Sequence, residues 1–382
     1  MMTNSGLRRI QGVLADLLYG IFNGFLTGVR MILFGRKLPQ DPKTILILRS
    51  GHLGDTLCAI PALIGIRDRF PGARRILMTN STDGTLPFPK EVLDKIVDFD
   101  EVMTYDPNQI GNLTYLKNLS TKIQNEKIDL FIYLGQSIAT PWRILRDMIF
   151  FKVAGCKSAV GFRVDTHRFF VLGQRFNRRF LQEPVRLLEL LKPLGVSFDG
   201  HWPIPTGATS LDERVGGPRV AIHPWAKYPV KRWPLELFIE VASDLQKKYK
   251  AQIVLIGGAD TTESGRLIRE KLGHGVIDFT GKTNFLETAE VLRQCDFLLS
   301  NDSGPVHLAA AVKTPVVGIY SARDFPNAWY PSGSSHEVLR KDVECQICYL
   351  ETCPIMICIN QISSEDVLNA CERILKKTGG YR

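Results

Sequence analysis

The spacing of hydrophobic and polar positions divides the chain into parts of different character. Residues 7–37 carry apolar side chains at helical spacing, from Ile10 to Leu33, which predicts one long amphipathic helix. From Lys43 onward, short apolar runs such as Thr44–Leu48 alternate with helical stripes. Strands and helices that alternate in this way form parallel sheets covered by helices, so an α/β fold is predicted.

A second series of strands and helices begins after a stretch rich in proline and glycine. Residues 193–218 have the composition of an interdomain linker. Beyond it, apolar runs at 219–222, 252–256, 276–279, 297–299 and 316–319 predict the strands of a second sheet. We therefore divide the chain into an N-terminal helix (1–40), a first domain (41–205), a second domain (215–360) and a C-terminal helix that returns towards the first domain (361–382).

The N-terminal helix favours association with a membrane. A spanning helix needs ~20 mainly apolar residues, whereas this helix has a polar face with Gln11, Asp16, Asn23 and Thr27. Flanking arginines and Lys37 suit a helix that lies in the interface of an anionic bilayer. One alternative is a spanning helix packed through Gly20, Gly24 and Gly28. Another is a helix docked on the protein's own surface.

Composition and charge restrict the class of partner. A hydrophobic content of 45% and a charged content of 23% are typical of a globular protein. The net charge of +9 favours an acidic partner, such as a nucleotide, a phosphorylated sugar or an anionic lipid. Nucleic acid is not expected, because RNP, helix-turn-helix and zinc-finger spacings are lacking. Without a cleavable signal peptide, we expect cytoplasmic residence.

The stretch Ser300–His307, S-N-D-S-G-P-V-H, lies between an apolar run and a helical run. Asp302 and Ser303 can cap the helix, and Gly304 lets a ligand approach the backbone. Because the N-terminus of a helix attracts anions, a diphosphate site is one interpretation, and His307 would face the same ligand. An ordinary capped turn is the other.

The first predicted strand ends in R-S-G-H-L-G-D, with Asp55 at the start of the next helix. The helix dipole there favours an ionised carboxylate, which could serve as a general base or simply as a cap. The spacing is not that of a dinucleotide fingerprint, so a nicotinamide cofactor is not expected. The residues predicted to line a cleft beside Asp55 are Ser50, Gly51, His52 and Gly54.

Three further positions could contact a nucleotide. Lys231 lies beside the helix that starts at Pro234, a setting that suits a diphosphate. Glu263 follows a glycine turn, where a carboxylate could accept hydrogen bonds from ribose hydroxyls or cap a helix. Thr283 ends the next strand segment and could line a base pocket.

Four cysteines, Cys345, Cys348, Cys353 and Cys358, crowd into one segment. Thiolates so close together could bind zinc or an iron–sulfur cluster. The spacing matches no common zinc pattern, so reduced cysteines or a labile disulfide are equally consistent with it.

Together these motifs resemble glycosyltransferase family 9, the lipopolysaccharide heptosyltransferase family. The resemblance extends from Lys43 to Lys377 and rests on R-S-G-H-L-G-D-T-L-C-A-I-P-A-L, H-P-W-A-K-Y-P-V-K-R-W-P and S-N-D-S-G-P-V-H-L-A-A-A, in that order. It implies a GT-B fold: two Rossmann-like, doubly wound domains that face a cleft, with the acceptor on the first and the donor on the second. Pro305 and the N-terminal helix depart from the general pattern.

The resemblance also implies an activity and roles for residues. The activity is inverting transfer of a heptose from a nucleotide-activated donor, usually ADP-heptose, to the lipopolysaccharide core. Asp55 matches the family's proposed base, Lys231 the lysine that meets the donor phosphates, and Glu263 a ribose-contacting glutamate. Donor-motif positions are matched by Asp302, Ser303, Gly304 and His307.

This activity predicts the partners and the location of the chain. We expect a nucleotide-sugar donor, a lipopolysaccharide-core or lipid-linked glycan acceptor, and the cytoplasmic face of the inner membrane. No cofactor and no divalent metal are expected to be required, because Lys231 and a helix N-terminus would stabilise the leaving group. Two alternatives stay open: a GT-B transferase that uses another nucleotide-sugar for O-antigen or another surface glycan, and a non-catalytic nucleotide-sugar binding protein at the membrane.

Overall fold

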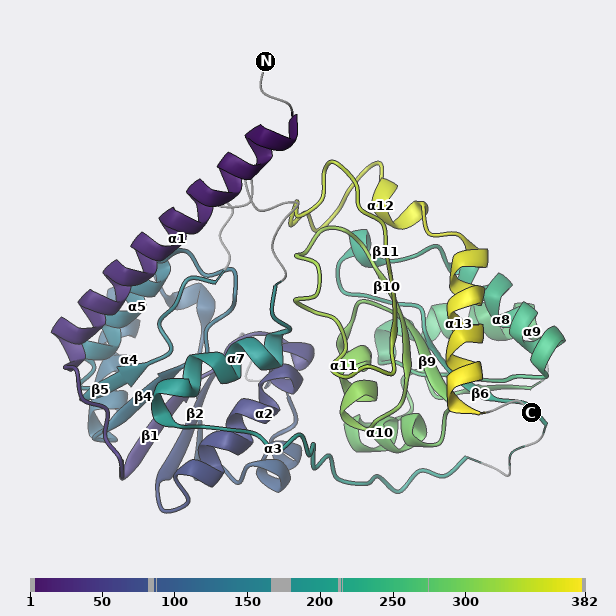
Figure 1. Cartoon of the computed structure of the whole chain (residues 1–382). Coiled ribbons are helices and arrows are strands. Elements are labelled where there is room, and N and C mark those ends of the chain that lie inside the picture. The colour runs from purple at the N-terminus through teal and green to yellow at the C-terminus, as the bar shows by residue number, and fades with distance from the viewer. Residues whose placement is uncertain are drawn as a thin grey trace. The chain divides into compact units, whose positions relative to one another are not determined.

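The computed structural model describes residues 4–81, 86, 88–165, 180–211, 214, 216–273 and 275–379. The chain forms two compact units, Met1–His201 and Trp202–Arg382 (Figure 1). The boundary lies within the proline- and glycine-rich stretch 193–218. Each unit contains one parallel sheet covered by helices, as the alternating pattern predicts.

The first unit is built on a five-stranded sheet with the order β3-β2-β1-β4-β5. Central strand β1 is buried on both faces, with Ile45, Leu46 and Ile47 inaccessible to solvent. This explains why its sequence is an unbroken apolar run. The strands are β1 (Thr44–Leu48), β2 (Arg74–Asn80), β3 (Glu101–Tyr105), β4 (Leu130–Tyr133) and β5 (Ser158–Val160), and the helices between and after them are α2 (Leu53–Arg69), α3 (Lys90–Ile96), α4 (Leu113–Asn125), α5 (Pro141–Val153) and α7 (Glu183–Leu191).

The second unit is built on a six-stranded parallel sheet with the order β11-β10-β9-β6-β7-β8. The chain reverses its direction across the sheet between β6 and β9, and in the first unit between β1 and β4. Ligands of doubly wound sheets bind beside such switch points, at the carboxyl ends of the strands. The strands are β6 (Arg219–His223), β7 (Gln252–Leu255), β8 (Val276–Asp278), β9 (Phe297–Asn301), β10 (Val316–Tyr320) and β11 (Glu337–Arg340), and the helices are α8 (Leu235–Tyr249), α9 (Thr262–Leu272), α10 (Phe285–Arg293), α11 (Gly304–Ala311), α12 (Ile357–Asn360) and α13 (Ser364–Thr378).

Helix α13 belongs to the core of the second unit. It begins at a capping box of Ser363 and Asp366 and packs against α8 (Figure 1). Its inner face, with Val367, Ala370 and Ile374, is inaccessible to solvent and joins the core of this unit. We predicted a helix that returns towards the first domain. That return stays a prediction. Within the second unit, the apolar face holds α13 on its own sheet, because leaving would expose it to water.

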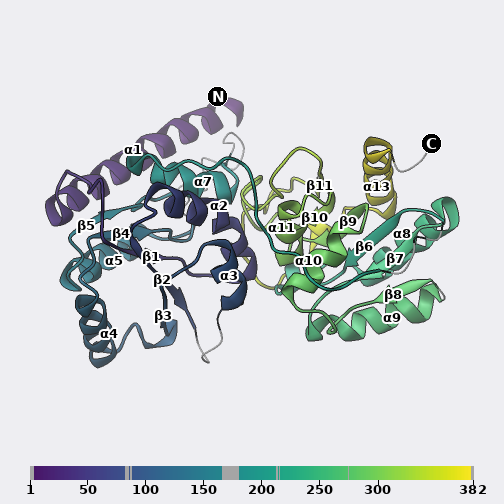
Figure 2. The ribbon, with the colours of Figure 1, turned by 90° about the horizontal axis from the view of Figure 1, so that it is seen from below.

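Helix α1 (Asn4–Phe34) confirms the predicted N-terminal helix and runs along α5 and β5 (Figures 1 and 2). Leu26 and Phe34 are buried against the first unit. The Asn23 amide donates to the carbonyl of Val164 (3.0 Å) and accepts from its N–H (2.9 Å). Asn23 was predicted on the polar face of the helix, and in the structure its amide completes the backbone bonding of Val164 on the docked side.

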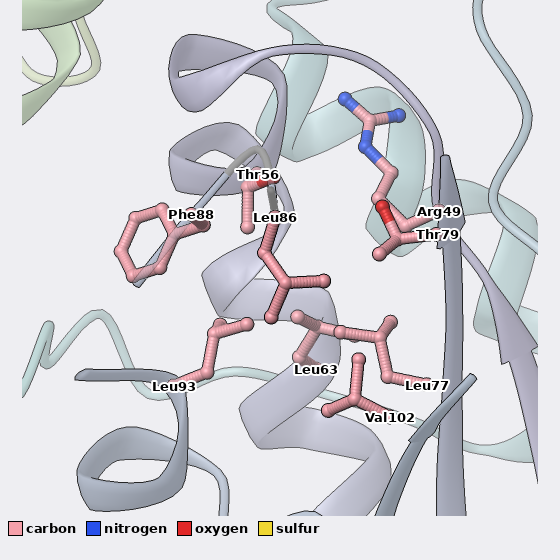
Figure 3. Close-up of a pocket in the computed structure, with 9 residues that line it drawn as sticks. All are labelled: Arg49, Thr56, Leu63, Leu77, Thr79, Leu86, Phe88, Leu93 and Val102. Atoms are coloured by element: carbon pink, nitrogen blue, oxygen red, sulfur yellow. The ribbon is translucent and has the colours of Figure 1, made fainter. Parts of the chain in front are cut away.

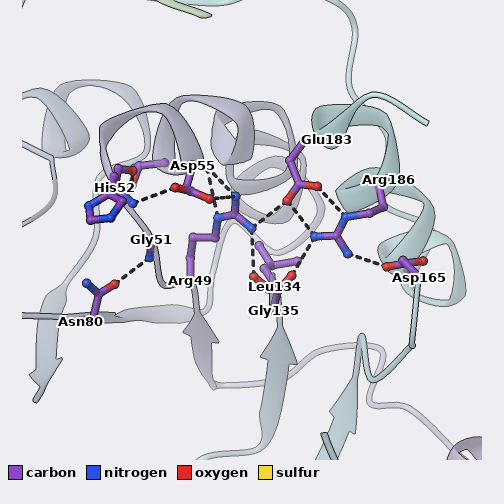
Figure 4. A network of polar contacts seen from close by, with 11 residues as sticks. Arg49, Gly51, His52, Asp55, Asn80, Leu134, Gly135, Asp165, Glu183 and Arg186 are labelled. Carbon is purple, nitrogen blue, oxygen red and sulfur yellow. Dashed lines mark hydrogen bonds and ion pairs between the residues drawn. The ribbon is translucent and has the colours of Figure 1, made fainter. Parts of the chain in front are cut away.

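A chain of buried charges holds α7 to the first sheet (Figure 4). Glu183, the first residue of α7, accepts from Arg49 at the end of β1 (3.1 Å) and from Arg186 (2.6 Å). Arg186 also pairs with Asp165 (2.6 Å) and donates to the Gly135 carbonyl after β4 (2.7 Å). Burial by itself would raise the pKa of Glu183, but the two arginines outweigh it and lower that pKa to about 2. Glu183 is therefore ionised, and it joins three elements.

Replacing Glu183 with glutamine should lower the free energy of unfolding at pH 7 by about 3 kcal/mol, because two buried guanidinium groups lose their shared carboxylate. The folded pKa lies below the unfolded one, so this stabilisation is complete above about pH 4.5 and is lost as the pH falls towards 2. Urea unfolding of both proteins between pH 7 and pH 3 measures this. A difference that stays constant down to pH 3 would contradict the lowered pKa.

Candidate functional site

The ends of β6 and β9 meet at the switch point of the second sheet. Asn301, the last residue of β9, accepts from the N–H of Trp233 (3.0 Å) and donates to the carbonyl of Pro224 (2.9 Å). His223, the last residue of β6, lies 3.0 Å through Nδ1 from the hydroxyl of Ser303. Asn301 is fully buried. These bonds join the loops after the two strands into one framework.

Lys231 lies in this framework between two carboxylates. Its ammonium is 2.6 Å from Asp302 and 2.8 Å from Asp324, and its side chain is only 12% exposed. Asp324 in turn pairs with Arg323 at 3.1 Å. The guanidinium of Arg323 stacks 4.6 Å over the ring of Tyr228. A lysine predicted from the sequence to meet phosphates is thus positioned by a four-charge cluster.

The charges of this cluster shift one another's pKa values. Burial alone would lower the pKa of Lys231, but Asp302 and Asp324 outweigh it and raise the pKa above the ordinary value. Burial raises the pKa of Asp302, and the neighbouring Asp324 adds to that rise. Asp324, which has both Lys231 and Arg323 beside it, keeps a lowered pKa despite its burial. The lysine is a permanent cation, and Asp302 is the more easily protonated of the two carboxylates.

The predicted donor turn lies beside Lys231. Ser303 is the N-cap residue of α11, Gly304 is its first residue, and the Ser303 side chain makes no capping bond. His307, one turn further, is buried and packs edge-on against Trp329 with ring centroids 6.2 Å apart. Through Asp302 the turn is bonded to Lys231. The structure therefore brings together a cation and a helix N-terminus, the two features that bind a diphosphate.

His223 is a site residue that the sequence interpretation missed. Burial lowers its pKa to about 4, so the imidazole is neutral near pH 7 and can exchange a hydrogen bond with Ser303. Asp324 and Arg323 were also missed. Their position in the loop that follows strand β10 is the available signal, because all carboxyl ends of a parallel sheet lie at one edge.

Glu263 and Thr283 lie in the loops and helices that follow β7 and β8. Glu263 is exposed and pairs with Arg266 at 2.7 Å within α9. The hydroxyl of Thr283 is 2.9 Å from that of Thr288. Glu263 and Thr283 each contact a residue of their own local segment. Their predicted contacts with ribose and base stay predictions.

In the first unit, Asp55 lies in the first turn of α2 at the end of β1. One oxygen of its carboxylate accepts from the N–H of His52 (2.8 Å), which makes a capping box. The other oxygen lies 3.7 Å from Arg49, and the Asp55 side chain keeps 17% exposure. Asp55 therefore caps the helix and still presents a partly accessible carboxylate. Both roles considered from the sequence are compatible with this geometry.

The backbone around Asp55 depends on glycine and on a buried arginine. Gly51 has φ +142°, and a Cβ there would lie 2.4 Å from the Asp55 side chain. Its N–H donates to Asn80 (2.7 Å), while the Arg49 guanidinium donates to the Asp55 carbonyl (2.7 Å) (Figure 4). These contacts fix the turn. Of the other residues predicted to line the acceptor site, Ser50 is buried, His52 is exposed, and Gly54 is the second residue of α2.

A small cavity lies in the first unit between α2, the sheet and the segment around Phe88 (Figure 3). Arg49, Thr56 and Thr79 contribute its polar atoms, and its other walls are apolar. Its volume of about 10 Å³ is enough for roughly one water molecule. It is too small to hold a sugar.

The four-cysteine segment packs against the donor framework. The N–H of Ile347 donates to the Ala322 carbonyl (2.7 Å), and the N–H of Tyr349 donates to the Arg323 carbonyl (3.1 Å). Cys345 is exposed and Cys358 is buried, and burial raises the pKa of the Cys358 thiol. Within the described residues, no group of three or more His, Cys, Asp or Glu side chains could hold a metal ion. A metal at these cysteines stays an untested prediction.

Comparison with known proteins shows which family and which enzymes the chain is similar to. Residues 204–357 match the model of glycosyltransferase family 9 (heptosyltransferase). The chain is 24% identical over 333 residues to lipooligosaccharide heptosyltransferase 2 of Campylobacter jejuni, across 85% of this chain and 96% of that protein. Among solved structures, the glycosyl transferase family 9 protein of Veillonella parvula superposes with a TM-score of 0.66 at 20% identity, covering 90% of this chain and all of the other (100%).

A second solved structure, E. coli heptosyltransferase WaaC with ADP-2-deoxy-2-fluoro heptose, has a TM-score of 0.59 at 18% identity and covers 86% of this chain and 99% of WaaC. At these identities the solved structures show the fold, which is the predicted GT-B fold. The segment matched by the family model contains Lys231 and the whole donor turn from Asp302 to His307. The chain is a glycosyltransferase, and its residues 204–357 match glycosyltransferase family 9.

Proposed function

We propose that the chain transfers a heptose from ADP-heptose to the core of lipopolysaccharide. The observation that carries this proposal is the buried Lys231 beside the N-terminus of α11, a site suited to a nucleotide diphosphate. The similarity to a lipooligosaccharide heptosyltransferase supports the sugar and the acceptor. The solved WaaC complex with an ADP-heptose analogue supports the nucleotide.

The proposed reaction is a single displacement with inversion at the anomeric carbon. An acceptor hydroxyl attacks that carbon, its oxygen forms the new glycosidic bond, and its proton passes to the carboxylate of Asp55. The bond from the anomeric carbon to the diphosphate breaks, and ADP leaves with the electron pair. Lys231 and the N–H groups at Ser303 and Gly304 stabilise the charge that grows on the leaving group. Asp55 belongs to the first unit and Lys231 to the second.

The location we propose is the cytoplasmic face of the inner membrane. Residues Leu17–Phe34 of α1 are long and apolar enough to cross a bilayer, and 11% of that segment is buried within the protein. An acceptor with a lipid anchor would be presented at such a surface. The exposed apolar residues of α1 would hold the enzyme there.

Asp55→Asn should lower kcat for transfer by at least about 10²-fold, because an amide cannot take the acceptor's proton. Donor binding should stay intact. Product formation by mass spectrometry and donor-induced thermal stabilisation measure the two effects. Asp68→Asn, at an exposed carboxylate on the same helix, is the matched control and should behave like the wild type. Near-normal turnover of Asp55→Asn would remove Asp55 as the base.

Lys231→Gln should weaken donor binding and lower kcat by about 10²–10³-fold, because the leaving diphosphate loses its cation. Isothermal titration with ADP and steady-state kinetics check this. Lys247→Gln, at an exposed position on α8, serves as the control. An unchanged affinity for ADP in a folded Lys231→Gln protein would contradict the assignment of Lys231 to the diphosphate.

A thermal-shift screen of ADP-, UDP-, GDP- and CDP-sugars tests the nucleotide. Only an ADP-sugar should raise the melting temperature, because a ligand that binds only the folded state stabilises it. Stabilisation by a UDP-sugar would favour another surface-glycan transferase. Stabilisation by ADP-heptose without transfer or donor hydrolysis would favour a binding protein.

A further inference from the structure

Helix α1 exposes an apolar face although its opposite face is docked. Leu17, Ile21, Phe25 and Ile32 are 59%, 58%, 56% and 84% exposed. Their spacing places them on one side of the helix. The docked side holds Leu26, which is inaccessible to solvent. Docking therefore covers one apolar side of α1 and leaves the other apolar side exposed to water.

Helix α5, which packs against α1, has an exposed apolar face of its own. Trp142, Ile149 and Val153 are 77%, 50% and 64% exposed, and spacings of seven and four residues place them on one face. The neighbouring Lys152 has its ammonium 5.6 Å from the ring centroid of Phe34, so this face adjoins the end of α1. A tryptophan at such a position is typical of the boundary between water and lipid.

Cations dominate the charge of both helices. Residues 4–40 contain five cations and one carboxylate, Asp16. Of the cations, Arg30 donates to the carbonyl of Ala159 (3.1 Å) and faces the protein; the others are Arg8, Arg9, Arg36 and Lys37. Segment 138–153 contains three cations and a single carboxylate, Asp147, which accepts hydrogen bonds from Tyr133 and Arg146. Apolar side chains accompanied by cations complement a surface whose anionic headgroups lie above acyl chains. The three cations of the second segment are Arg143, Arg146 and Lys152.

We infer that α1 and α5 together bind an anionic bilayer surface, and that α1 lies in the plane of the membrane while it stays docked. Spanning would require α1 to give up the two bonds between Asn23 and Val164 and the burial of Leu26. A Cβ added at Gly20, Gly24 or Gly28 would meet no atom within 4 Å, so the glycines do not form the packed side.

This inference rests on the proposed membrane location and is independent of the transfer reaction. It adds a second helix and an orientation to that location. The enzyme would lie with α1 and α5 against the headgroups, the three exposed residues of α5 reaching the acyl boundary. If α1 alone anchored the enzyme, α5 would not contact the membrane; in the arrangement inferred here it does.

Cosedimentation of the full chain with vesicles tests the inference. Vesicles of phosphatidylcholine mixed with phosphatidylglycerol should pellet the protein, and vesicles of phosphatidylcholine alone should pellet it far less. The triple variant W142S/I149S/V153S should bind the mixed vesicles at least about tenfold more weakly, because three apolar side chains are lost from the contact. The matched control L113S/V185S removes exposed apolar residues from α4 and α7 and should bind like the wild type.

Quenching of tryptophan fluorescence by brominated lipid provides a second measurement that does not depend on the folding of the triple variant. The full chain should be quenched in mixed vesicles, and the conservative variant Trp142→Phe should lose most of that quenching while it still binds. Equal binding of the folded triple variant, or unchanged quenching in Trp142→Phe, would overturn the role of α5. Failure of the full chain to bind either kind of vesicle would overturn the membrane location as well.

Discussion

A buried cation must be matched by carboxylates, and this constraint organises the switch point of both sheets. In the first unit, Arg49 lies under the first turn of α2 and is matched by Glu183. In the second unit, Lys231 is matched by Asp302 and Asp324. Removing one partner would leave a charge in a low dielectric, which is far costlier than losing an exposed pair. Each site is thereby fixed in shape before any ligand arrives.

The two clusters differ in what they leave available. The N–H groups of Arg49 donate to the carbonyls of Leu134 and Asp55 and to Glu183. Arg49 therefore holds the Asp55 backbone in place. Lys231 keeps 12% of its side chain exposed and lies next to the N-terminus of α11, which Ser303 does not cap through its side chain. The first cluster positions a carboxylate, and the second presents a cation. This division fits a base in one unit and a leaving-group site in the other.

Local patterns predicted the elements and the residues directly attached to them. Buried strands such as Thr44–Leu48 are continuous apolar runs, and Asp302 and Ser303 follow a strand and precede a helix. The short strands β3, β5 and β11, each at the edge of its sheet, were missed, because their apolar patterns are weak. Asp324 and Glu183 could not be assigned either, since their partners are distant in the sequence and pairing over such a separation leaves no periodic signal.

Asn23 gives α1 a property that a purely apolar helix would lack. A docked apolar stripe can slide or rotate with little change in contact area, whereas the two bonds to the Val164 backbone are satisfied at a single angle. A leucine at this position would bury more apolar surface but would leave the rotation of the helix less defined. Polar residues inside coiled coils act in the same way, trading stability for a unique register. In α1 the register determines which side chains point away from the protein.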